Sequence, residues 1–115
     1  MGRIIGSSVR VVIDRPLGSA HPEHPDLIYE VNYGYIPGIF APDGEEQDAY
    51  VIGPDQPIGE FTGVVRAILI REDDIETKWI VEAEGAAGLS DHEILSAVHF
   101  QEQYFRTRLL RHDPE

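Results

Sequence analysis

Apolar and polar residues alternate over short distances along the first three quarters of the chain, and glycine or proline separates most apolar segments from the next. These segments are rich in β-branched and aromatic residues, which favours strands. We expect five strands, at residues 9–14, 26–33, 48–53, 60–71 and 77–83. Five short strands joined by such turns predict a small barrel or a sandwich.

The pattern changes after a glycine-rich linker at residues 85–88. Ser90 and Glu93 form a capping-box sequence, in which each side chain can bond the backbone N–H of the other residue. Apolar residues then recur about every 3.6 positions, at Ile94, Val98, Phe105 and Leu109. This spacing predicts one amphipathic helix from Ser90 to about Arg111. The expected fold class is mainly β with a C-terminal helix, in one domain spanning residues 1–115.

Charge and composition narrow the classes of partner. The chain has 115 residues, with 21 acidic residues against nine Lys and Arg, and a formal charge of −12. Such a charge disfavours nucleic acids and anionic membranes as partners, but a bound divalent cation can still attract an anionic substrate. The sequence has neither an apolar stretch of about 20 residues nor a signal-peptide pattern. We therefore expect a cytoplasmic protein that does not contact membranes.

Acidic residues gather in two of the predicted turns. The stretch PDGEEQD contains Asp43, Glu45 and Asp48, and the stretch REDDIETK contains Asp73 and Glu76. Because the chain has no cysteine, a metal would need oxygen or imidazole ligands, which favours hard ions such as Mg²⁺. Two acidic turns at adjacent strand ends can form a two-metal site for phosphoryl transfer. The alternative is that both turns are simply solvated.

Several motifs together resemble one enzyme family. NYGYIPG followed by DGEEQD resembles the N-Y-G-[FY]-I-P and D-G-D-P-x-D signatures of the soluble family I inorganic pyrophosphatases. VVIDRPLGS is similar to the V-x-E-I-P-x-G-S strand of that family, DDIETKWIVEA to its D-x(4)-D-x-K segment, and HFQEQYF to the H-F-F-E-x-Y-K of its last helix. These blocks occur in the family's order along nearly the whole chain. The resemblance implies an OB-like five-stranded β-barrel with a flanking helix.

The resemblance also implies an activity, the hydrolysis of pyrophosphate to two phosphates with Mg²⁺, or with Mn²⁺ or Zn²⁺. Glu45 stands at the general-base position, and Asp48 is the residue expected to bridge two ions. The implied metal ligands are Asp43, Asp48, Glu76, Asp14, and either Asp73 or Asp74. The implied phosphate-binding residues are Tyr33, Lys78 and Tyr104.

The chain also departs from the family pattern. Glu replaces Asp at positions 45 and 76, and Phe105 stands where the helix motif has a lysine. The hairpin that carries a phosphate-binding Lys and an Arg is replaced by a segment containing HPEHP. The nearest replacement cations are Arg15 and Arg106. Each charge-assisted hydrogen bond that is lost weakens phosphate binding by about 1.5–3 kcal/mol.

His21 and His24 in the HPEHP segment have three interpretations. They can contact phosphate in place of the lost lysine, bind a transition metal together with Glu23, or be polar residues of a proline-stiffened loop. Three hypotheses for the whole chain follow. It is a pyrophosphatase, a phosphohydrolase acting on another diphosphate or phosphoanhydride, or a non-catalytic protein that binds metal and phosphate. The sequence leaves open whether it forms a homo-oligomer.

Overall fold

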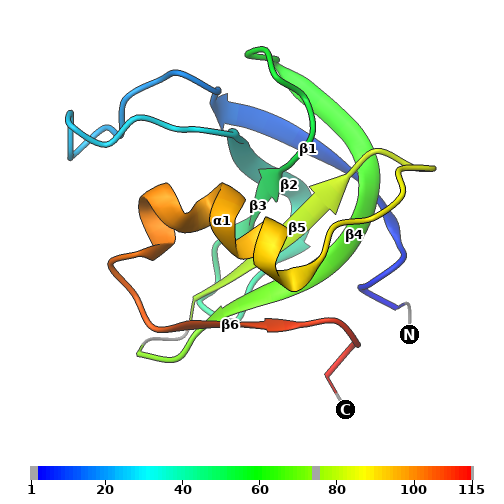
Figure 1. Ribbon diagram of the computed structural model, residues 1–115. Helices are drawn as coiled ribbons and strands as arrows, with labels where there is room; N and C mark the ends of the chain where they lie inside the picture. The colour runs from blue at the N-terminus through cyan, green and yellow to red at the C-terminus, as the bar shows by residue number, and fades with distance from the viewer. Residues whose placement is uncertain (1–2, 74–75, 115) are drawn as a thin grey trace.

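The computed structural model describes residues 3–73 and 76–114 and contains six strands and one helix (Figure 1). The strands are β1 (Ser8–Arg15), β2 (Asn32–Phe40), β3 (Glu46–Val51), β4 (Glu60–Arg71), β5 (Thr77–Glu82) and β6 (Thr107–Leu110), and the helix is α1 (Asp91–Glu102). The sheet order is β1-β2-β3-β5-β4-β6, and β1 also pairs with β4. That last pairing closes β1 to β5 into a five-stranded barrel, as expected. No helix in the described part of the chain is both long and apolar enough to cross a membrane.

The second strand lies later in the sequence than expected. Residues 26–31 belong to the long β1–β2 connection, and β2 continues through residues 34–38, GYIPG, whose glycines and proline predict a break. Gly34 explains the difference. A Cβ atom at this position would overlap the backbone carbonyl of Val12 on β1. The glycine therefore allows two paired strands to approach closely, and it does not end a strand.

The helix is shorter than expected. The Ser90–Glu93 capping box is present, but α1 ends at Glu102, and residues 107–110 form β6. The reason lies in the edge of β4. β1 pairs with β4 only from Glu60 to Val64, whereas β6 pairs with it from Ile68 to Arg71. β6 thus covers the half of the β4 edge that β1 leaves open, a tertiary pairing that overrides the helical periodicity.

Apolar side chains form two layers, one inside the barrel and one between the barrel and α1. Val11, Val65 and Trp79 belong to the interior layer. Tyr33 belongs to the second layer, together with Ile94 and Val98 of α1. Because side chains alternate along a strand, Lys78 points opposite to Trp79 and faces the helix side. α1 and the β1–β2 connection lie on this same side of the barrel (Figure 1).

Candidate active site

A cavity of about 590 Å³ lies between the barrel, the β1–β2 connection and the C-terminal end of α1. Many of the side chains selected from the sequence line it: Arg15, His21, His24, Tyr33, Asp48, Glu76, Lys78 and Tyr104. They come from four strands, two loops and the residues that follow α1. The fold therefore brings together residues that are up to 89 positions apart, from Arg15 to Tyr104.

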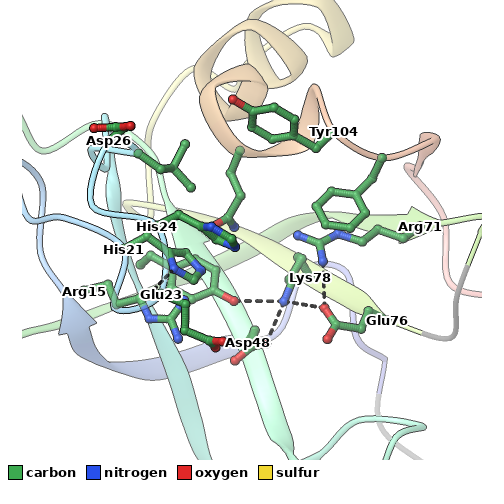
Figure 2. Close-up of a pocket in the computed structure, with 14 residues that line it drawn as sticks. Arg15, His21, Glu23, His24, Asp26, Asp48, Arg71, Glu76, Lys78 and Tyr104 are labelled. Carbon is green, nitrogen blue, oxygen red and sulfur yellow. Dashed lines mark hydrogen bonds and ion pairs between the residues drawn. The ribbon is translucent and has the colours of Figure 1, made fainter.

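Lys78 is the centre of the cavity floor. Its ammonium group donates to Asp48 Oδ2 at 2.7 Å and to the Tyr33 hydroxyl at 2.9 Å, and it lies 2.9 Å from Glu76 Oε2 (Figure 2). Asp48 and Lys78 are direct partners in the parallel pairing of β3 with β5. A buried ammonium requires such compensation, and Lys78 is only 3% exposed. The arrangement fixes one positive charge at the base of the cavity.

The surroundings of Lys78 shift the pKa values of its partners. Burial raises the pKa of Tyr33 well above its usual value, and the negative charge of Asp48 adds to this effect. Burial also opposes the ionisation of Glu76, but the hydrogen bond from Lys78, with the charges of Lys78 and Arg71, outweighs it and lowers the pKa of Glu76. Tyr33 is therefore a neutral hydroxyl, and Glu76 a carboxylate, at neutral pH.

Arg15 and the HPEHP segment form another wall. Arg15 Nη1 donates to the Tyr29 hydroxyl at 2.7 Å, and the Arg15 guanidinium lies 5.5 Å from the centre of the Tyr33 ring. The rings of His21 and His24 are 4.9 Å apart. Burial lowers the pKa of His21, and the positive charges of Arg15 and His24 act in the same direction. The protein without ligand thus favours neutral His21, and Arg15 supplies the permanent positive charge on this wall, beside the carboxylate of Glu23.

Arg71 also lines the cavity, and the sequence analysis did not select it. Its Nε and Nη2 atoms donate to the two oxygens of Glu102 at 3.0 and 2.8 Å, and Nη1 donates to Glu76 at 2.9 Å. The Phe105 ring lies 3.7 Å from the guanidinium carbon. The available signal was a charged residue ending the longest apolar segment, and this pattern also fits a solvated strand end.

Other predicted residues lie outside the cavity lining. Asp43 and Glu45 are exposed on the β2–β3 turn, where the Glu45 N–H donates to Asp43 Oδ1 at 3.0 Å. Asp73 and Arg106 are exposed as well. Asp74, the alternative to Asp73, falls outside the described residues. The turn carboxylates and the cavity carboxylates are therefore not gathered into one cluster in this arrangement.

The donor set limits how a metal could bind. Among residues 3–73 and 76–114, no three His, Asp or Glu side chains converge into a metal-binding group. Asp14 and Asp48 are close enough to interact. Partial burial raises the pKa of Asp14, the charge of Asp48 adds to this, and Arg15 opposes it. Mg²⁺ commonly binds one or two carboxylates together with phosphate oxygens and water. The residues thus fit an ion that is shared with a phosphate ligand, rather than a centre built by protein groups alone.

Solved structures share this architecture. An inorganic pyrophosphatase from Ehrlichia chaffeensis matches with a TM-score of 0.67 and 17% identity, over 90% of this chain and 85% of that chain. One from Neisseria gonorrhoeae matches with a TM-score of 0.63 and 22% identity, over 86% and 74%. The fold is that of the inorganic pyrophosphatases. The OB-like barrel expected from the motifs is confirmed.

The sequence itself is similar to one curated pyrophosphatase. An inorganic pyrophosphatase from Caulobacter vibrioides is 34% identical over 94 residues, which cover 79% of this chain. The chain spans about half of that relative, 47% of its length. No protein-family model matches the chain. These similarities agree with the resemblance seen in the motifs, and the activity is a separate proposal.

Proposed function

We propose that this chain hydrolyses inorganic pyrophosphate to two phosphates, with a divalent cation, Mg²⁺ first, shared between the protein and the substrate. The observation that carries the proposal is the cavity in the pyrophosphatase fold where Lys78, Tyr33 and Asp48 meet. Ammonium and hydroxyl donors suit phosphate oxygens, and the carboxylates supply the oxygen ligands that Mg²⁺ prefers.

In the reaction, a water oxygen forms a bond to one phosphorus atom, the bridging P–O bond breaks, and the second phosphate leaves with the bridging oxygen. Lys78 and Arg15 would hold the phosphate oxygens, and Asp14 and Asp48 would hold the cation. A bound divalent cation would lower the pKa of water and neutralise phosphate charge. Asp48 is the candidate proton acceptor within the cavity, since Glu45 lies on the exposed β2–β3 turn.

The size of the cavity favours a second candidate, a diphosphate that carries an organic group. A volume of about 590 Å³ falls within the roughly 300–1,000 Å³ range of organic-ligand pockets. Tyr104 is 69% exposed and lines this cavity, so it offers an aromatic surface beyond the cations. ADP is a suitable probe for this alternative.

Phosphate release from pyrophosphate, and separately from ADP, tests both candidates with Mg²⁺, Mn²⁺ and Zn²⁺. We expect metal-dependent release that falls by about a hundredfold or more in Asp48→Asn, because that residue serves both the cation and the proton. Asp55→Asn, an exposed aspartate outside the cavity lining, is the matched control. Absence of release from both substrates with all three metals would reject hydrolysis by this chain.

A further inference from the structure

The geometry points to Arg71 as a second phosphate-binding cation, held in place by Glu102, so that Arg15 and Arg71 bind the two phosphates of one diphosphate. This inference rests on the proposed function, because it concerns a ligand of the same cavity. It goes beyond the motif-based assignment, which placed no binding residue at position 71.

The first observation is the shared partner of Arg71 and Lys78. Glu76 Oε2 lies 2.9 Å from Arg71 Nη1 and 2.9 Å from Lys78 Nζ. Figure 2 shows both cations directed at this one carboxylate beside the open cavity. An oxygen atom held between two cationic donors has the surroundings that a phosphate oxygen requires. Arg71 and Lys78 thus form a two-cation position for an anionic oxygen.

The second observation is that Arg71 is held rigidly. Glu102 binds it through two hydrogen bonds, one to each carboxylate oxygen, and the centre of the Phe105 ring lies 3.7 Å from the guanidinium carbon. Arg71 is 6% exposed and Glu102 is 4% exposed. A guanidinium has five N–H groups, and the three hydrogen bonds found among the described residues use three of them. Two N–H groups therefore remain for a ligand.

The third observation links the two arginines through the end of α1. The Arg15 guanidinium donates to Tyr29, and the Tyr29 hydroxyl donates to Gln101 Oε1 at 2.8 Å. Gln101 Nε2 in turn donates to the Tyr50 hydroxyl at 2.6 Å, and this hydroxyl donates to Glu102 Oε2 at 2.6 Å. Glu102 then holds Arg71. One continuous hydrogen-bond network thus fixes both guanidinium groups, which lie on either side of Lys78 in Figure 2.

The replacement at position 105 fits this arrangement. The helix motif has a lysine there, whereas this chain has Phe105, whose ring packs on Arg71. Arg71 of β4 therefore supplies the positive charge at this wall. Phe105, in the segment that follows α1, supplies the aromatic surface that orients the guanidinium. A clamp with one arginine on each side matches the two phosphates of a diphosphate and should discriminate against a single phosphate.

The test measures binding of methylene diphosphonate, a diphosphate analogue that is not hydrolysed, by calorimetry with Mg²⁺, and compares it with inorganic phosphate. Arg71→Met should weaken diphosphonate binding by about 10- to 100-fold, the effect of one lost charge-assisted hydrogen-bond pair. It should weaken phosphate binding much less. Arg66→Met is the matched control, because Arg66 lies on the same strand and pairs with Glu82 at 3.4 Å outside the cavity lining.

Since Arg71→Met leaves the Glu102 carboxylate buried without its main partner, the double variant Arg71→Met with Glu102→Gln is measured as well. If the double variant keeps the wild-type circular dichroism spectrum and binds the diphosphonate within twofold of wild type, the inference is overturned. Equal weakening of phosphate and diphosphonate overturns the two-sided clamp. In Arg71→Ala, partial restoration of binding by millimolar methylguanidinium supports a direct contact with the ligand.

The same proteins are assayed for phosphate release from pyrophosphate, which separates the two claims. If wild type binds the diphosphonate but releases no phosphate, hydrolysis fails, and the Arg71→Met binding result alone decides the inference. If wild type does not bind the diphosphonate, the clamp is overturned whatever the turnover.

Discussion

Glu102→Gln is the change whose effect on stability follows most directly from the structure. The substitution preserves the shape of the side chain but removes a buried negative charge that accepts hydrogen bonds from Arg71 and Tyr50. Loss of one partner of a buried ion pair costs about 3–5 kcal/mol. Because Glu76 still pairs with Arg71 at 2.9 Å, we expect the lower end, a decrease of about 3 kcal/mol in the free energy of unfolding.

Urea unfolding followed by tryptophan fluorescence measures this change, since the single tryptophan, Trp79, is 8% exposed in the barrel interior. With an m-value of about 2 kcal/mol per molar urea, the midpoint should fall by about 1.5 M. Glu84→Gln, at an exposed position, should leave the midpoint unchanged. The double variant Arg71→Met with Glu102→Gln should recover much of the loss, because neither charge is then left buried alone.

A decrease of less than about 1 kcal/mol in Glu102→Gln would refute this reasoning. It would mean that solvation of Arg71 compensates for the lost partner. The network that joins α1 to the barrel would then contribute little to stability.

Three further predictions concern single positions. Gly34→Ala should lower the free energy of unfolding by about 2 kcal/mol or more, because the added Cβ meets the β1 backbone; Gly59→Ala, where the same atom meets nothing, is the control in urea unfolding. Ser90→Ala should cost about 1 kcal/mol through loss of the helix cap, measured by thermal melting beside the exposed Ser96→Ala. Glu76 has a pKa below the ordinary value of 4.5, so its ion pairs stabilise the fold above that pH and are lost as pH falls through the lowered folded-state pKa. The urea midpoint of Glu76→Gln should therefore fall less steeply than that of wild type on acidification below about pH 4.5, and equal slopes would contradict this account.

The sequence predicts elements well where the cause is local. The bounds of β4 match the longest apolar segment, and the helix begins at its capping box because both partners lie within one turn. Prediction from the sequence fails where the position of an element depends on contact with a distant segment. β2 was misplaced because the need for Gly34 depends on the β1 backbone, and β6 was missed because it depends on the open edge of β4.

The site follows the same rule. Tyr33, Asp48 and Lys78 lie in short motifs that resemble those of the inorganic pyrophosphatases, and the structure places all three in one hydrogen-bonded group. Arg71 could not be selected, because its burial depends on Glu102, which is 31 residues away. A charged residue at the end of an apolar segment has the same sequence pattern whether it is solvated or paired.

The distribution of charge constrains the species that enters the cavity. Three of the nine Lys and Arg residues in the chain, Arg15, Arg71 and Lys78, line this one cavity, although the formal charge of the whole protein is −12. Four carboxylates of the same lining, Glu23, Asp26, Asp48 and Glu76, offset that local positive charge. A free diphosphate would therefore meet an opposing field over most of the surface and no excess of positive charge in the described cavity lining. A divalent cation on the diphosphate would reduce the repulsion from the protein surface, and Asp14 and Asp48 would supply oxygen ligands to that cation. This balance favours the metal–diphosphate complex over the free anion as the form in which the proposed substrate would bind.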